Sequence, residues 1–177
     1  MKNFAVKVEG KTYWISRSIA TAVHVFKVIN SDLYVLAEKR GSGVQYPGLY
    51  CIVCGYLDYD ETLQEGAIRE LREETGINIT EDRLNLVDIY SSHSENRQNI
   101  TVHYYTFLKE NEDFDLTKAQ GGEENEVEKI EWIKLGKIKH EDELQINTEV
   151  FSKYDWAFNH DRKIMKTLKM IYIINEE

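Results

Sequence analysis

The chain has 177 residues, of which 42% are hydrophobic and 30% charged, and these values predict one globular domain with a small extension. Its formal net charge of −9 argues against a general nucleic-acid binder and against a protein that binds anionic membranes. A phosphorylated substrate would need local cations to overcome this field.

Targeting signals are not evident in the sequence. The segment Met1–Gly10 has no apolar run of signal-peptide length, and the apolar stretch Ile19–Val28 is too short to span a bilayer. The 2 cysteines do not form a disulfide framework. We therefore expect a cytoplasmic protein with no membrane association.

Alternating apolar residues predict strands in the first third of the chain. Two short strands flank a turn at Glu9–Lys11, so residues 1–17 are expected to form an N-terminal β-hairpin extension. Further strands are expected at residues 18–29, 33–37 and 49–53. The exposed edge of the hairpin offers one route to a homodimer.

Two helices interrupt the strands that follow. The first is expected at residues 61–75, where Thr62 and Glu65 form a capping-box pattern and Gly76 stops the helix. The second, amphipathic helix is expected at residues 161–174. Strands are expected at 84–90, 100–108 and 127–133, with a polar loop at 93–99. This order predicts an α/β domain over residues 18–177, with helices sandwiching a mixed β-sheet.

The first helix carries three glutamates on one side. Glu70, Glu73 and Glu74 have the spacing i, i+3 and i+4, so their carboxylates are expected to converge, while Arg69 is expected on the solvent side. Like charges at this spacing repel one another, whereas a hard divalent cation such as Mg²⁺ would attract them all. A solvated acidic face is the alternative. Gly66 lies on the same side, where a missing side chain would let another backbone approach closely.

Residues 55–77, GYLDYDETLQEGAIRELREETGI, match every fixed position of the motif G-x5-E-x7-R-E-U-x-E-E-x-G-U, in which U is a bulky aliphatic residue. This motif is the Nudix box, and the chain therefore resembles the Nudix hydrolase family. Two departures are Val53-Cys54 where many members have Pro-Gly, and Gly66 where alanine is more usual.

The resemblance implies an α/β/α sandwich with a mixed β-sheet and hydrolysis of a nucleoside diphosphate linked to another group. It implies that Glu70, Glu73 and Glu74 hold Mg²⁺ or Mn²⁺, with the backbone carbonyl of Cys54 as a further ligand. It also implies that Arg69 orients a glutamate of the box. Structural roles are implied for the motif residues Gly55, Glu61 and Gly76.

The substrate is less clearly indicated. Residues 90–108 and Trp156–Asp161 resemble segments of the branch that contains ADP-ribose pyrophosphatases, which favours an ADP-ribose-like small-molecule nucleotide. Nucleoside triphosphates, sugar nucleotides, dinucleotides and RNA caps remain alternatives. Arg40 and Arg97 are candidates for binding phosphate, and Tyr50 for stacking a base, although solvation and core packing would also explain them.

The general base has two candidates. Glu70 would lie in the metal cluster, where a bound cation lowers the pKa of a carboxyl and makes it a poorer base. The loop Gly121–Glu126 offers Glu124 as the favoured alternative, slightly ahead of Glu123 and Glu126. A simple solvated loop would explain the same residues.

Cysteines and histidines complete the analysis. Cys51 and Cys54 lack a second pair for zinc and, in one strand, would face opposite sides, so we expect structural roles. His103 is expected on the sheet surface, and His160 in helix packing. A Nudix-fold sensor that binds a nucleotide without cleaving it is the main alternative to an enzyme.

Overall fold

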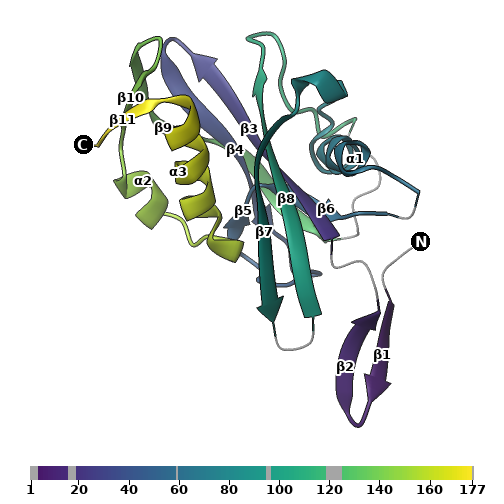
Figure 1. Cartoon of the computed structure of the whole chain (residues 1–177). Coiled ribbons are helices and arrows are strands. Elements are labelled where there is room, and N and C mark those ends of the chain that lie inside the picture. The colour runs from purple at the N-terminus through teal and green to yellow at the C-terminus, as the bar shows by residue number, and fades with distance from the viewer. Residues whose placement is uncertain (1–3, 16–18, 59, 95–96, 119–124, 177) are drawn as a thin grey trace.

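The computed structural model describes residues 4–15, 19–58, 60–94, 97–118 and 125–176. Within these residues, nine strands form one mixed sheet in the order β11-β10-β9-β4-β3-β8-β7, with β5 paired to β4 and β6 paired to β3 (Figure 1). The strands are β3 (Ile19–Ile29), β4 (Asp32–Arg40), β5 (Tyr50–Cys51), β6 (Val53–Tyr56), β7 (Asn85–Ser94), β8 (Arg97–Leu108), β9 (Val127–His140), β10 (Glu143–Ile146) and β11 (Ile173–Glu176). Pairs β3–β8 and β10–β11 are parallel, and the other pairs are antiparallel.

Helices cover both faces of this sheet. The helices are α1 (Leu63–Thr75), α2 (Glu149–Ser152) and α3 (His160–Ile171), and two 3-10 turns are η1 (Glu81–Arg83) and η2 (Ala157–Asn159). Helix α1 lies on one face and α3 on the other (Figure 1). The predicted sandwich of helices around a mixed sheet is therefore confirmed.

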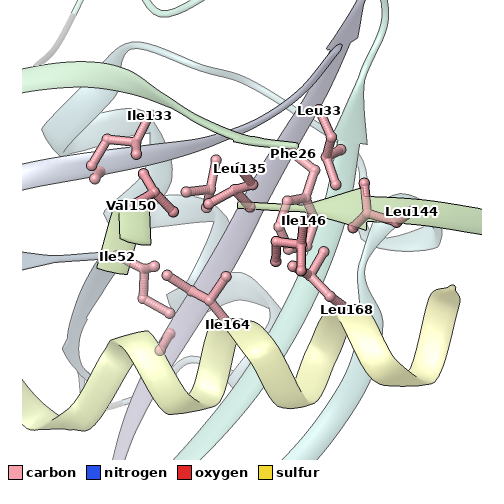
Figure 2. Packing of buried hydrophobic residues seen from close by; sticks show 13 residues of the cluster. Phe26, Leu33, Ile52, Ile133, Leu135, Leu144, Ile146, Val150, Ile164 and Leu168 are labelled. Carbon is pink, nitrogen blue, oxygen red and sulfur yellow. The ribbon is translucent and has the colours of Figure 1, made fainter. Parts of the chain in front are cut away.

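Two hydrophobic clusters hold the helices in place, because alternate residues of a strand point to opposite faces. On β3, Phe26 packs with Ile164 and Leu168 of α3, as Figure 2 shows, while Val25 packs with Leu71 of α1. A buried aliphatic side chain of this size contributes about 1.5–3 kcal/mol relative to an exposed one. One cluster fixes α3 against the sheet, and the other fixes α1.

The ends of α1 match the sequence prediction. Thr62 accepts a hydrogen bond from the Glu65 N–H, and the Glu65 side chain accepts one from the Thr62 N–H. Gly76 ends the helix with φ 72° and donates its N–H to the Arg72 carbonyl. A Thr or Ser cap contributes about 1 kcal/mol.

The N-terminal hairpin forms its own two-stranded sheet, of β1 (Phe4–Val8) and β2 (Lys11–Ile15). The strands pair antiparallel around Glu9 and Gly10, which both have positive φ. In Figure 1 the hairpin projects away from the main sheet. Within the described residues, no helix is long and apolar enough to cross a membrane.

Three predicted element boundaries are wrong. The expected polar loop at residues 93–99 is mostly strand, because β7 and β8 continue to Ser94 and from Arg97. The expected strand at 49–53 is two strands, β5 and β6, which pair with different partners. The last helix ends at Ile171, and β11 follows it in parallel pairing with β10. Strand pairing decides all three cases.

His103 is buried, not on the sheet surface as its alternation with Val102 and Tyr104 indicated. Helices cover both sheet faces, so alternation does not distinguish a buried from an exposed face. His103 Nδ1 lies 3.0 Å from His24 Nε2, and the His160 ring stands at 5.8 Å. His160 accepts a hydrogen bond from the Ile52 N–H through Nδ1, at 3.1 Å, in keeping with its expected packing role.

Candidate active site

Arg69 organises the N-terminal half of α1 together with the loop before it. The expectation that it faces solvent is wrong, because its side chain is only 19% exposed and bends back toward this loop. All five guanidinium N–H donors are used. Their acceptors are both carboxylate oxygens of Glu61 at 2.7 and 2.9 Å, the Tyr56 carbonyl at 3.0 Å, Glu70 at 2.8 Å and Glu73 at 3.1 Å.

Glu61 also holds the loop that precedes the helix in place. Its Oε1 accepts a hydrogen bond from the Asp58 N–H at 2.6 Å. Arg69 and Asp58 together hold the pKa of Glu61 below its ordinary value, Arg69 having the larger effect. The Glu61 side chain therefore braces the loop as a carboxylate.

The three glutamates differ in their partners. Glu70 and Glu73 both form ion pairs with Arg69, which neutralises part of their charge. Glu74 is buried, with 6% exposure, and the charge of Glu70 contributes to the rise of its pKa. Within the described residues, no three His, Cys, Asp or Glu side chains are arranged to hold a metal ion.

Glu74 meets a carboxyl that the sequence analysis missed. Glu38 of β4 is 2% exposed, and its side chain is close enough to that of Glu74 for the two to interact. Burial raises the pKa of both carboxyls well above the ordinary value, and for Glu74 the charge of Glu38 is the next cause. An acid on the same strand face as the buried Leu36 was the one signal available in the sequence.

Gly55 leaves space for Glu70. A Cβ built at Gly55 would lie 2.1 Å from Oε1 of Glu70, so the carboxylate rests directly on the glycine backbone. The absence of a side chain at Gly66 does not admit a neighbouring backbone, contrary to what the sequence led us to expect. A Cβ there would meet the side chains of Leu57 at 2.8 Å and Glu61 at 2.9 Å, not a neighbouring backbone.

Cys51 and Cys54 lie next to the buried carboxyls. Their thiols are close enough to affect each other's pKa, so the expectation that they face opposite sides is wrong. The reason is the break at Ile52, which separates β5 from β6 and changes the direction of the chain. Both cysteines are free thiols, and Cys54 pairs with Ala22 of β3.

The three candidate substrate-binding residues differ in what surrounds them. Arg40 donates to the Gln45 carbonyl at 2.6 Å and to Cys51 Sγ at 3.5 Å, and its guanidinium stacks over Phe158 at 5.0 Å. Tyr50 donates its hydroxyl to Glu131 at 2.6 Å, which raises the pKa of Tyr50 to about 12. Arg97 begins β8 opposite Ser94, and its side chain lies outside the described part of the structure.

The segment Trp156–Asp161 brings an aromatic ring beside Arg40. Phe158 and Asn159 have φ of 58° and 54°, a conformation that costs a non-glycine residue about 1 kcal/mol or more. This backbone turns the Phe158 ring toward Arg40 and into edge contact with Tyr46, at 5.3 Å between ring centroids. Tyr46 is 45% exposed, so the group formed by Arg40, Tyr46 and Phe158 reaches solvent.

Of the three loop glutamates, the structure describes Glu126, whereas Glu123 and Glu124 lie outside the described residues. The Gly41 N–H donates to the Glu126 carbonyl at 2.7 Å, and the Gly43 N–H to the Asn125 carbonyl at 3.1 Å. The charge of Glu126 contributes to the raised pKa of Glu70 and of Glu74. The end of the loop is therefore fastened beside the carboxylates.

The donor set fits a hard divalent cation. Glu74 Oε2 and Glu38 Oε1 are buried and have no hydrogen-bond partner in the described residues. Native proteins rarely leave such atoms unsatisfied. Carboxylate oxygens are the ligands that Mg²⁺ prefers, and it commonly uses one or two of them together with water and substrate phosphates.

These buried groups make the stability of the metal-free protein depend on pH in two opposing ways. Burial raises the pKa of Glu70 from 4.5 to about 7, so between these values the fold keeps a proton that the unfolded chain has lost, and this contribution to stability is lost as pH rises from 4.5 through 7. Burial lowers the pKa of His24 to about 3 and of His103 to about 2, so stability also falls below about 6.5.

Thermal unfolding of the wild type and of Glu70→Gln in EDTA between pH 4 and 9 tests this prediction. The stability of the wild type relative to the variant should fall as pH rises from 4.5 through 7 and then stay constant, because the group titrates between these values. Added Mn²⁺ should reverse this fall, because a cation favours the charged carboxylate. A difference between the two proteins that does not change with pH from 4.5 to 7 would contradict the assignment.

The chain is similar to a known protein family over most of its length. The family model described as "NUDIX domain" matches residues 19–154, which is more than half of the chain. The search of curated proteins found no match.

Solved structures share the fold at low sequence identity. A MutT/nudix family protein from Enterococcus faecalis has a TM-score of 0.69 and 20% identity, and the match covers 89% of this chain and 62% of that protein. The chain thus spans less than two thirds of the Enterococcus protein. The NUDIX domain of Shewanella oneidensis NrtR, complexed with ADP ribose, has a TM-score of 0.66 and 18% identity, covering 88% of this chain and 89% of that one.

A third similar structure is the bifunctional NMN adenylyltransferase/ADP ribose pyrophosphatase of Francisella tularensis, complexed with AMP and a Mn ion. Its TM-score is 0.59 at 20% identity, and the match covers 86% of this chain and 41% of that protein. Identities at this level show a common fold.

Proposed function

Because this chain belongs to the Nudix family, we propose that it is a Mg²⁺- or Mn²⁺-dependent pyrophosphohydrolase that cuts the diphosphate linkage of a nucleoside diphosphate derivative. The observation that carries the proposal is the constellation on α1, in which Arg69 fixes Glu61, Glu70 and Glu73 while Glu74 presents a buried, unpartnered carboxylate oxygen. A solvated acidic face would not bury Glu74.

Each residue then has a role. Glu70, Glu73 and Glu74, with the Cys54 carbonyl, would hold the cation. Arg69 positions Glu70 and Glu73 by direct hydrogen bonds, and Glu61 holds Arg69 and the loop. Gly55 lets the Glu70 carboxylate lie against the backbone, and Gly76 ends the helix just after the glutamates.

When bound, a divalent cation would neutralise charge on the diphosphate and lower the pKa of a water molecule. The protein's own task is to place the phosphates and to accept the proton of that water. A chain with net charge −9 needs cationic side chains near the phosphates. Arg40 and Arg97 are our candidates, and Tyr50 and Phe158 offer aromatic faces for a base.

We place the general base on the loop before β9. Single Gln substitutions at Glu123, Glu124 and Glu126 should identify it, because loss of the base removes about 10²–10⁴-fold in kcat and the acidic limb of the pH–rate profile. Glu124 stays our first candidate, and Glu126 gains support from its charge effect on Glu70. If all three variants keep normal kcat, Glu70 becomes the base.

ADP-ribose is our proposed substrate class. The support is the resemblance of residues 90–108 and 156–161 to the ADP-ribose pyrophosphatase branch, together with the fold shared with the ADP-ribose complex of NrtR. With Mn²⁺ present, kcat/KM for ADP-ribose should exceed that for nucleoside triphosphates. Chromatography of AMP and phosphate over a nucleotide panel measures this ratio, and a tenfold preference for a triphosphate would exclude this class while keeping the hydrolase.

A nucleotide sensor is the second candidate function. It is favoured by the fold shared with NrtR, which has also been seen in complex with a 27mer DNA. Binding of ADP-ribose without release of AMP would select it. The free thiols of Cys51 and Cys54 support our proposal of a cytoplasmic location.

A further inference from the structure

Glu38 lies outside the motif, yet it lies beside Glu74, on the buried side of the proposed metal site. It belongs to β4, where it pairs with Ile130 of β9 on one side and with Cys51 of β5 on the other. These neighbours leave it 2% exposed. A carboxyl in such surroundings loses its hydration, which costs several kcal/mol unless a partner compensates.

Its partner in the structure is another acid. The Glu38 and Glu74 side chains are both buried and close enough to interact, and two adjacent buried carboxylates repel each other unless a positive charge lies between them. Each also keeps one buried oxygen without a partner, Glu38 Oε1 and Glu74 Oε2. Two adjacent buried acids with unsatisfied oxygens are suited to bind a positive ion.

No side chain in the described residues supplies that positive charge by direct contact. Arg40 is the nearby cation, and its hydrogen bonds go to the Gln45 carbonyl and Cys51 Sγ. Arg69 is committed to Glu61, Glu70 and Glu73. The pair therefore needs either a shared proton or a bound cation.

We propose that Glu38 is an additional ligand of the divalent cation held by Glu74, joining the box of α1 to strand β4. The inference rests on the proposed function and deepens it, because it names a ligand that the motif does not contain. The cation takes the place of the shared proton and satisfies the two unpartnered oxygens at once. Glu38 thereby makes the affinity for metal depend on the position of α1 relative to the sheet.

A Glu38→Gln variant separates a ligand from a proton-sharing acid. The Gln amide can donate a hydrogen bond to Glu74 and so replaces the protonated acid, but it removes a carboxylate ligand. Mn²⁺ binding to the full chain, followed by the electron paramagnetic resonance signal of free Mn²⁺, should show a Kd raised about 10–100-fold. Glu143→Gln on β10, an acid away from the site, serves as the matched control and should bind as the wild type does.

The outcomes distinguish this inference from the proposed function. If the wild type binds no Mn²⁺, both fail. If the wild type binds and Glu38→Gln has the same Kd, Glu38 is not a ligand, while the hydrolase proposal stands. Should the variant not fold, the anomalous signal of Mn²⁺ in crystals of the wild type decides. A peak at about 2.1 Å from a Glu38 oxygen supports the inference, and a peak bound by Glu74 without Glu38 overturns it.

Discussion

Replacing Glu74 with Gln is expected to lower kcat/KM for ADP-ribose by about 100-fold or more, since loss of even an outer-shell partner of a metal costs about 10–100-fold. The same change should leave the melting temperature in EDTA unchanged or higher. The reason is that Glu74 is buried next to Glu38, and Gln removes a group whose charge the interior disfavours.

Steady-state kinetics at saturating Mn²⁺ and thermal unfolding in EDTA measure the two effects on the same preparation. Glu143→Gln provides the control for an acid-to-amide change remote from the site. Loss of activity together with a large loss of stability would indicate a structural role for Glu74. Full activity in Glu74→Gln would remove it from the metal site.

Gly55→Ala should abolish most activity at little cost in stability. The new methyl group would stand 2.1–2.5 Å from the Glu70 carboxylate, which is the end of a flexible side chain and can move away. The fold therefore loses little stability, but Glu70 leaves the position in which Arg69 holds it. We expect kcat to fall by about 100-fold, the scale of effects from misplaced catalytic groups.

Gly41→Ala is the matched comparison. Its methyl group would meet the Asn125 carbonyl at 2.0 Å, and this is backbone that cannot swing aside. Overpacking of this kind costs about 1–3 kcal/mol, or roughly 2–4 °C in melting temperature per kcal/mol for a chain of this size. We expect Gly41→Ala to be clearly less stable than Gly55→Ala. The reverse order, with Gly55→Ala fully active, would contradict it.

Local signals in the sequence predicted α1 well. The capping box of Thr62 and Glu65 and the terminating Gly76 act within a few residues of one another, and the structure has them as predicted. The family is likewise confirmed, because the box residues follow one another in a fixed spacing. The roles of these residues in metal binding and catalysis stay predictions.

Features that depend on contacts between distant segments were not predictable. The spacing of Glu70, Glu73 and Glu74 did not show that Arg69 pairs with two of them or that Glu38 lies beside the third. Glu38 is 36 positions before Glu74, on a strand that only the sheet places beside α1. His103 was misplaced because its strand is covered on both faces.

Cys51 and Cys54 illustrate a third kind of error. Alternation along one strand puts them on opposite sides, and that reasoning holds only while the strand is continuous. At Ile52 the chain stops pairing with β4 and begins to pair with β3, so two short strands replace one. A period-two pattern cannot show such a change of partner.

Direct observation of the reaction tests the central claim that the chain hydrolyses a diphosphate linkage. Phosphorus NMR of ADP-ribose with the wild type and Mn²⁺ should show the diphosphate signals replaced by two phosphomonoester signals, one of them AMP. EDTA or the Glu74→Gln substitution should prevent this change. Diphosphate signals that broaden on binding and persist with Mn²⁺, for ADP-ribose and every other nucleotide of the panel, would contradict the account and identify the chain as a binding protein.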